Sequence, residues 1–493
     1  MLHPTLIKAS QLAREIAAQF FTRKVSEGLS FSTCCWVPAR VKVCGMITVE
    51  MKHLLASLVA GILGICAFDG AAAPADHRPS ADHPTAELAR AIRTDQTLTE
   101  VHRMAQELLR HGLNAGNGYS EVWIRDLNTF LEVALEVNPP ERLREALLTF
   151  FKFQGPSGDI VDGYVPLDQA KVKYAYRTSP LAGNLMAHKN TVETDQESSL
   201  VQAVAKYVRV TGDTAFLNEQ VDGLTIRKRL GLALLYVTTE RFDHRHGLVW
   251  GATTADWGDV QPESPWGVEL DAQSHRALDI YDNAMLILAL NDYLALLGGK
   301  SREATPWRGV RDELKRSVRS HLWDARQQKF IPHVYLAGSP FPKDFDENQI
   351  YYHGGTAVAI QAGLLSPREV RRSLDHMVAD VRAAGAASIG LTMYPPYPEG
   401  FFKNPQMRSP YSYQNGGDWC WFGGRMIQAL IEQGDIAEAY RELRPMVERV
   451  RRVGGFYEWW SRDNQPRGSG DFRGSAGVLG RAIELLQVWA EQH

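Results

Sequence analysis

The stretch "LIEQGDIAEAYREL" (residues 430–443) has apolar residues at helical spacing on both sides of a Gly-Asp pair. Glycine commonly ends a helix, and aspartate commonly caps the next one. The stretch "YVRVTGDTAFLNE" (207–219) repeats this arrangement. Both stretches therefore predict two helices joined by a short turn, the αα-hairpin.

The rest of the chain extends this helical pattern. Apolar residues at helical spacing predict about a dozen helices and few strands. The predicted ranges are 86–111, 126–137, 142–153, 197–212, 227–242, 277–298, 310–323, 354–365, 367–384, 425–434, 437–453 and 476–491. No βαβ alternation and no glycine-rich phosphate loop occurs. The fold class is therefore all-α.

Long irregular segments separate these hairpins. Residues 240–251 and 321–334 each predict a helix end, a hydrophobic-Asp turn and a short extended piece. Segments this long and this aromatic are typical of functional loops. An open solenoid would show a sequence period, and none is present. A closed toroid is therefore expected, with the long loops gathered at one mouth.

The N-terminal part has a different composition. Residues 1–50 are interpreted as a mis-called or disordered extension, and Met51 as the true start. Residues 51–75 have a basic start, a short apolar run and small residues, which predict a signal peptide. Residues 76–85 would then be a linker, and 86–493 a catalytic domain. The protein is expected to be periplasmic or secreted, with a lipid anchor at Cys66 as an alternative.

The composition narrows the class of partner. The formal net charge of the 493 residues is -3, which gives no electrostatic reason to bind nucleic acid or an anionic membrane. Many of the twelve tryptophans lie beside Gly, Asp or Glu. Such tryptophans suit a cleft that stacks against sugar rings, so a neutral carbohydrate is the expected partner. Of the five cysteines only Cys420 would remain in an exported chain, and its flanks predict a packed helix start.

Acidic residues lie among the Trp and Gly of these loops. Hydrolysis of a glycosidic bond needs two carboxyl groups, one on each side of the sugar. The candidate groups are Glu121 with Arg125 and Asp126; Glu193, Asp195 and Glu197; Asp256 and Asp259; Asp418; and Glu458, Asp463 and Asp471.

Four motifs occur in a fixed order: "WIRDLNTF" (123–130), "GLVWGATTADWGD" (247–259), "YQNGGDWCWFGG" (413–424) and "FYEWWSRDNQPRGSGDFRGSAG" (456–477). In this order the chain resembles the six-hairpin, (α/α)6-barrel glycosidases over roughly residues 90–490. It is most similar to glycoside hydrolase family 63 and its mannosylglycerate-hydrolase-like members. It departs at "GGDWCW", where the family more often has Gly-x-x-Trp-Pro, and this leaves the substrate open.

The resemblance implies Asp256 as the general acid and Glu458 as the general base of an inverting glycosidase. Trp257 beside Asp256 offers an apolar wall that would raise a carboxyl pKa. Asp259 is the alternative acid. Structural alternatives also remain: Asp256 as a turn or helix cap, and Glu458 in an ion pair with Arg462 or Arg473.

The expected product is a terminal α-linked glucose or mannose released from a small glycoside or oligosaccharide. Substrate contacts are expected from the remaining motif residues. Alternatively, Arg125 and Asp126 could form an ion pair that caps their helix, and Gln196 and Glu197 could stabilise the start of theirs. These contacts are Trp123, Arg125, Asp126, Gln196, Glu197, Trp257, Asp259, Tyr413, Gln414, Asn415, Asp418, Trp419 and Trp459.

Other activities fit the same pattern less well. The same fold could host a glycoside phosphorylase, a polysaccharide lyase or a carbohydrate-binding protein that has lost catalysis. A carboxylate on both sides of the cleft favours hydrolysis. No cofactor is expected. No metal site is expected either, because Arg245 separates His244 from His246 and no HExxH motif occurs. His353 is interpreted as a packed or capping histidine.

Overall fold

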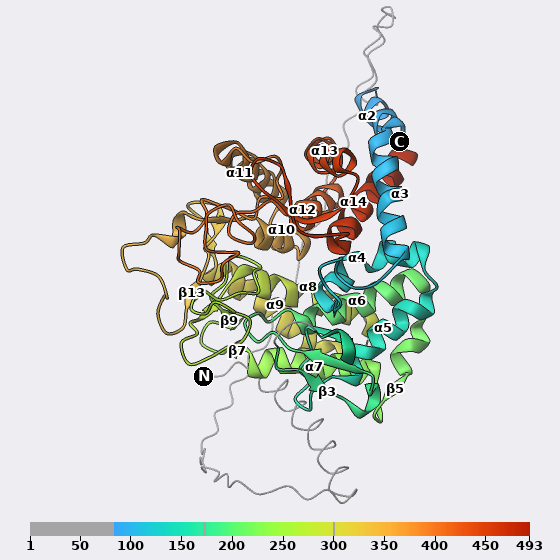
Figure 1. Ribbon diagram of the computed structural model, residues 1–493, viewed down its shortest axis with the longest axis vertical. Helices are drawn as coiled ribbons and strands as arrows, with labels where there is room; N and C mark the ends of the chain where they lie inside the picture. Colours follow the sequence, from blue (N-terminus) through green and yellow to red (C-terminus); the bar gives the residue numbers. More distant parts are fainter. Residues whose placement is uncertain (1–82, 171–173, 299–300) are drawn as a thin grey trace, which may run out of the picture. The chain divides into compact units, whose positions relative to one another are not determined.

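The computed structural model describes residues 83–170, 174–298 and 301–493 (Figure 1). The predicted extension, signal peptide and Cys66 anchor lie outside these residues. Within them thirteen α-helices are present: α2 (His83–Thr94), α3 (Gln96–Arg110), α4 (Ile124–Val137), α5 (Pro140–Lys152), α6 (Gln196–Thr211), α7 (Ile226–Glu240), α8 (Ile280–Leu297), α9 (Ala304–His321), α10 (His353–Gln361), α11 (Pro367–Ala384), α12 (Cys420–Glu432), α13 (Ile436–Val453) and α14 (Arg473–Glu491).

The segments between the helices contain short antiparallel strands, more than the sequence predicted. They are β1 (Val122–Trp123), β2 (Gly163–Pro166), β3 (Arg177–Thr178), β4 (Leu185–His188), β5 (Gln220–Val221), β6 (Leu224–Thr225), β7 (Phe242–Asp243), β8 (Leu248–Val249), β9 (Gly251–Ala252), β10 (Arg276–Leu278), β11 (Trp323–Asp324), β12 (Lys329–Phe330), β13 (Val334–Tyr335), β14 (Tyr351–Tyr352), β15 (Met393–Tyr394), β16 (Tyr457–Trp460) and β17 (Pro466–Gly470). Their pairing orders are β1-β2-β4-β3, β13-β10-β9, β11-β12, β14-β15, β16-β17, β5-β6 and β7-β8.

Alternate helices pack side by side in a cyclic order. Helix α4 packs on α6, α6 on α8, α8 on α10, α10 on α12, α12 on α14, and α14 on α4. Helices α3, α5, α7, α9, α11 and α13 each pack against one or more of these six. This helix-rich arrangement fits an α/α toroid, and each of the helices α4, α6, α8, α10, α12 and α14 contributes buried residues to the core.

The helical joints follow the prediction in part. Gly434 has φ +83° between α12 and α13, and Gly212 has φ +72° after α6, so both glycines end a helix as expected. Asp435 makes no side-chain cap, and its carboxylate pairs with Arg371 at 3.3 Å. Asp213 does cap, but the element that follows is a short 3-10 turn (Thr214–Asn218) and the β5–β6 hairpin, not an α-helix.

Several predicted boundaries were wrong. Residues 86–111 form two helices, because Asp95 caps α3 by accepting a hydrogen bond from the Thr97 amide. Residues 277 and 278 belong to β10, and α8 begins at Ile280 after the cap Asp279. In contrast, the two predicted helix-end turns are confirmed, because 240–251 forms the β7–β8 hairpin and 321–334 contains the β11–β12 hairpin.

Helix α8 is the one helix among the described residues that is long and apolar enough to cross a membrane. The share of that window buried inside the protein is 72%. Its apolar composition is therefore that of a core helix in an inner position, packed between α6 and α10.

Candidate active site

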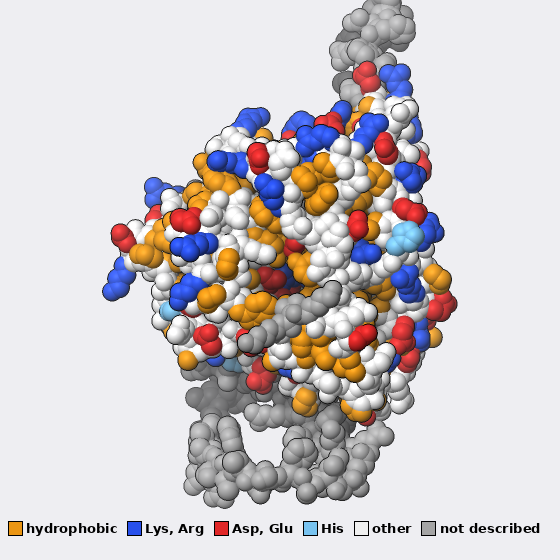
Figure 2. Space-filling model, viewed as in Figure 1, with side chains coloured by type: hydrophobic (Ala, Val, Ile, Leu, Met, Phe, Trp, Pro, Cys, Tyr) orange, Lys and Arg blue, Asp and Glu red, His pale blue; other side chains and the backbone are white. Residues whose placement is uncertain are grey.

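The face of the molecule in Figure 2 has a hollow near its centre, with acidic side chains at its floor and hydrophobic side chains around it. The candidate residues lie at the starts of the inner helices or in the segments that precede them. Asp126 lies in the first turn of α4, Gln196 opens α6, and Trp419 precedes α12. That the loops gather at one mouth of a closed toroid stays a prediction.

Glu458 lies on β16 at an irregularity in its pairing with β17. Such bulges turn a side chain away from its regular direction. Gly468, with φ +71°, makes room for this carboxylate, because a Cβ there would collide with Oε2 of Glu458. Only glycine therefore fits at this position of the hairpin.

Three hydrogen bonds hold the Glu458 carboxylate. Tyr119 donates to Oε1 at 2.8 Å, Tyr413 donates to the same oxygen at 3.3 Å, and the Ser469 amide donates to Oε2 at 2.9 Å. The side chain is buried, and burial raises its pKa, with a further contribution from the charge of Asp259. No ion pair with Arg462 or Arg473 forms; Arg473 donates to the carbonyl of Asn114 instead.

Asp259 is electrostatically coupled to three other acidic residues of the site. Its charge raises the pKa values of Asp126, Asp162 and Glu458. Its side chain is half-buried, and its Oδ1 accepts a hydrogen bond from Gln414 at 2.8 Å. The second oxygen has no hydrogen-bond partner among the described residues, so one face of this carboxyl group is available to a ligand.

Asp256 has different surroundings three residues earlier. Its two oxygens accept the backbone N–H groups of Gly354 at 2.7 Å and Gly355 at 2.8 Å, in the first turn of α10. Helix α10 has no side-chain cap of its own, so Asp256 caps it from a distant loop. Burial raises the Asp256 pKa to about 8, and these amide hydrogen bonds oppose that rise.

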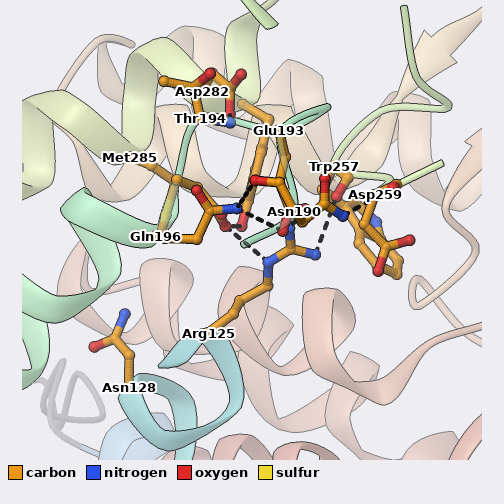
Figure 3. Close-up of polar contacts among 12 residues, drawn as sticks. Arg125, Asn128, Asn190, Glu193, Thr194, Gln196, Trp257, Asp259, Asp282 and Met285 are labelled. Atoms are coloured by element: carbon orange, nitrogen blue, oxygen red, sulfur yellow. Dashed lines mark hydrogen bonds and ion pairs between the residues drawn. The ribbon is translucent and has the colours of Figure 1, made fainter. Parts of the chain in front are cut away.

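Arg125 does not pair with its neighbour Asp126. It bonds to Asp195 at 2.7 Å, forms an ion pair with Glu193, and donates to the carbonyl of Trp257 at 3.4 Å. Figure 3 shows this guanidinium reaching from α4 toward Glu193 and Trp257. The guanidinium is thus held by partners within the protein.

Gln196 and Glu197 belong to the same buried layer. Lys189 donates to Gln196 at 3.1 Å and to Glu197 at 2.9 Å, while the Ile160 amide also donates to Glu197 at 2.8 Å. Both acceptor side chains are fully buried. They tie the start of α6 to neighbouring segments, so the structure favours the structural alternative for these two residues.

Asp126 and Asp162 are the remaining acids of the cleft. Burial raises the pKa of Asp126 to about 7, with the charges of Glu458 and Asp259 adding to the effect while Arg125 opposes it. Burial likewise raises the Asp162 pKa to about 8. Oδ1 of Asp126 is buried without a hydrogen-bond partner in the described part of the chain. Such an oxygen is costly unless a ligand satisfies it.

The sequence analysis missed Asp162 and Tyr119. Asp162 lies between Val161 and Gly163, directly before β2. An acid inside this apolar, glycine-containing segment was the available signal. Tyr119 lies in "NAGNGYS" (114–120), where only the glycines suggested a close approach of backbones.

The segment 413–419 has both site-facing and structural residues. Tyr413 and Gln414 contact Glu458 and Asp259, as described above. Asn415 instead bonds to the backbone of Tyr397 and Met407, and Asp418 pairs with Arg449 at 2.7 Å and bonds to Ser388. Both are buried, so their role is to hold the loop.

The tryptophans divide in the same way. Trp257 and Trp419 are buried and pack against each other at a centroid distance of 4.7 Å, with Phe422 stacked on Trp257. Trp123 and Trp459 are only partly buried, and Trp459 lies beside Tyr413. The second pair can contact a ligand, while the first pair supports the loops that carry Asp256 and Asp259.

The other assigned roles agree with their surroundings. Cys420 is buried at the first position of α12 and receives a hydrogen bond from Arg449. His353 is buried at the start of α10 and contacts Asp380. His246 bonds to Asp243 within a turn. Among the residues that the structure describes, no group of three or more His, Cys, Asp or Glu could hold a metal ion.

Comparison with solved structures found proteins with a similar fold. The GH63 mannosylglycerate hydrolase from Thermus thermophilus in complex with glucose has a TM-score of 0.56 and 17% identity, over 79% of this chain and 99% of that chain. The rhamnosidase from Klebsiella oxytoca with rhamnose bound has a TM-score of 0.53 and 15% identity, over 79% of this chain and 64% of that one. Comparison with curated protein sequences gave no match.

A sequence model described as the mannosylglycerate hydrolase MGH1-like glycoside hydrolase domain matches residues 129–475. This range covers more than half of the chain and contains Asp256, Asp259 and Glu458. The predicted resemblance to six-hairpin glycosidases is thereby confirmed. The chain belongs to the MGH1-like glycoside hydrolase family.

Proposed function

We propose that the protein is an exported, inverting glycoside hydrolase that releases a terminal α-linked glucose or mannose. The inner helices would close into an (α/α)6 barrel whose mouth holds the acidic cleft. The observation that carries the proposal is that one segment holds two carboxyl groups from different loops: Tyr413 donates to Glu458 at 3.3 Å, and the adjacent Gln414 donates to Asp259 at 2.8 Å. Paired carboxyl groups are what glycosidic hydrolysis requires.

Asp259 is the proposed general acid, in place of Asp256. A general acid must deliver a proton to the leaving oxygen. Both Asp256 oxygens already accept backbone N–H groups at the start of α10, so neither is free to reach a leaving oxygen, even though burial raises the Asp256 pKa to about 8. Asp259 keeps one oxygen without a partner among the described residues and lies in the same loop. The role of Asp256 is to fix that loop.

Glu458 is the proposed general base. Its raised pKa makes it a better proton acceptor than an exposed glutamate. Tyr119, Tyr413 and the Ser469 amide fix its orientation. It would take a proton from a water molecule as that water attacks the anomeric carbon, while Asp259 protonates the leaving oxygen on the opposite side. The anomeric configuration then inverts.

Asp126 is the proposed contact to the hydroxyl groups of the terminal sugar. Its unpartnered oxygen would accept a hydrogen bond from a sugar hydroxyl, which removes the cost of leaving it buried alone. Trp123 and Trp459, which are partly buried, would lie against the apolar faces of the same sugar. Arg125, Gln196 and Glu197 would act from beneath, by holding these elements in place.

The test is hydrolysis of α- and β-glycosides of glucose and mannose, with glucosylglycerate and mannosylglycerate included. The product anomer is followed by NMR. Glu458→Gln and Asp259→Asn should each lose about a thousandfold in kcat, at the strong end of general acid–base contributions. Asp259→Asn should keep much of its rate on substrates whose leaving group needs no proton, such as a glycosyl fluoride.

Asp256→Asn is the matched control. Its amide nitrogen would face one of two N–H donors, so this variant should lose stability, measured by thermal unfolding, more than catalytic competence per folded molecule. If Asp256→Asn loses the chemical step and Asp259→Asn does not, the assignment of the acid is overturned. If the enzyme releases a glycosyl phosphate only when phosphate is added, it is a phosphorylase and not a hydrolase.

A further inference from the structure

A continuous group of aromatic rings lies beside Asp259. Tyr174 contacts His188 at a centroid distance of 3.5 Å and Trp123 at 6.0 Å. Trp266 lies 5.3 Å from Tyr174 and is 42% exposed, which is unusual for so large an apolar side chain. These four rings, called the aromatic wall below, run from the start of α4 to the loop of Asp259.

Two polar side chains in this region lack partners. Both ring nitrogens of His188 lack a hydrogen-bond partner among the described residues, and the residue is only 1% exposed. Oδ2 of Asp162 is 3.8 Å from Nδ1 of His188, which is too far for a direct hydrogen bond. Neither carboxylate oxygen of Asp162 accepts a hydrogen bond from the described residues. Native proteins rarely leave such groups unsatisfied without a ligand or water.

The aromatic wall and these polar groups lie on the same side of the cleft as Asp259, the proposed general acid. The charges of Asp162 and Asp259 both raise the pKa of Tyr174. The side chain of Asn190, two residues after His188, donates to the backbone carbonyl of Asp259 at 3.0 Å. Trp266 follows Asp259 in the same loop. A group bonded to the oxygen that Asp259 protonates would therefore lie near these residues.

We propose that Tyr174 and Trp266 of the aromatic wall, with Asp162 and His188, bind the leaving group, and that this group is a second sugar ring. This inference rests on the proposed hydrolysis with Asp259 as acid. The apolar face of a pyranose ring would lie against Trp266 and Tyr174. Its hydroxyl groups would donate to Asp162 and bond to His188. A short acyclic leaving group would leave Trp266 uncovered.

The first experiment compares kcat/KM for α-linked disaccharides with kcat/KM for the corresponding glycosyl fluoride and glycerate conjugate. Disaccharides should be preferred over the glycerate conjugate by about tenfold or more. In Trp266→Ala the ratio of disaccharide to fluoride should fall by about tenfold, as expected when one stacking contact is lost. Asp162→Asn should lower the same ratio, with the change appearing mainly in KM.

Trp489→Ala is the matched control. Trp489 stacks on His493 at the C-terminal end of α14, whereas the N-terminal end of that helix lies near the cleft. This variant should leave the ratio unchanged. An equal fall for fluoride and disaccharide in Trp266→Ala, or no fall at all, would overturn the leaving-group assignment.

A binding measurement separates the two proposals. Asp259→Asn is titrated calorimetrically with maltose, mannobiose and the single-ring methyl glycosides. The second ring should add affinity, and Trp266→Ala should remove that gain. If no glycoside is hydrolysed by the wild type but this gain is present, the proposed function fails and the subsite stands. If the second ring adds nothing, the subsite is rejected whatever the hydrolysis results.

Discussion

Two groups of acidic residues, here named the lower group and the upper group, differ in their partners. In the lower group Glu193 and Asp195 pair with Arg125, and Glu197 pairs with Lys189. The upper group forms no ion pair with Lys or Arg anywhere in the described residues. It consists of Asp126, Asp162, Asp259 and Glu458.

This difference in pairing indicates that the lower group has a structural role, whereas the upper group is available to a ligand. A buried charge is tolerated when it is paired, so the lower group stabilises the starts of α4 and α6. The carboxylates of the upper group repel one another, and burial raises the pKa values of Asp126, Asp162 and Glu458. Such a cluster costs stability and is expected where chemistry requires it.

The largest predicted effect comes from breaking the lower group. Arg125→Leu would leave Glu193 and Asp195 buried without their cation, and should lower the unfolding free energy by about 3–5 kcal/mol. Denaturant unfolding measures the change. The control is Arg371→Leu, whose exposed pair with Asp435 should contribute about 0–1 kcal/mol. Equal effects of the two substitutions would contradict the distinction drawn above.

A second prediction concerns the position of Glu458. Gly468→Ala would place a methyl group against Oε2, in a backbone conformation that disfavours alanine, and should lower kcat by at least about tenfold. Gly454 has a similar φ of +73°, but nothing surrounds its missing side chain. Gly454→Ala should therefore share the stability loss of about 1 kcal/mol and keep full activity.

The smallest predicted effect comes from removing one carboxyl group, that of Asp126, from the upper group. Because the folded pKa of Asp126 is raised to about 7, its contribution to stability is present below its unfolded value and is lost as the pH rises through about 7. Asp126→Asn removes this loss. The variant should gain about 1 kcal/mol or more over wild type at pH 8, and much less at pH 4.

Thermal or denaturant unfolding at both pH values measures this gain, and activity should fall in the same variant. A gain that is larger at pH 4 than at pH 8 would show that Asp126 does not carry a raised pKa. A fall in stability at both values would place Asp126 among the supporting residues.

The helices could be predicted because their apolar residues repeat along one continuous stretch. The starts of α12 and α14 were predicted several residues too late, because Trp419 and Phe472 precede them without a side-chain cap. For the site, the sequence identified the loops that carry acids. It could not separate Asp256 from Asp259, because the partners of Asp256 lie about a hundred residues away, at Gly354 and Gly355.

Arg125, Gln196 and Glu197 show the same limit. Each is a polar residue at a helix start in a motif that resembles glycosidases, and sequence alone does not say whether its partner is a sugar or another side chain. Tyr119 and Asp162 were missed for another reason. Tyr119 precedes the acidic and tryptophan-containing stretch 121–126 and carries no carboxyl group, and Asp162 lies in a segment without tryptophan.

The bonds around Glu458 also join the two ends of the described chain. The Asn117 amide donates to Gly470, the Gly118 amide to Ser469, and the Arg473 amide to Ala115. During synthesis the N-terminal helices leave the ribosome hundreds of residues before these partners exist. The proposed base therefore reaches its final position only when the last hairpin closes on the first, and chains that stop short of residue 470 should be inactive even if most of their helices form.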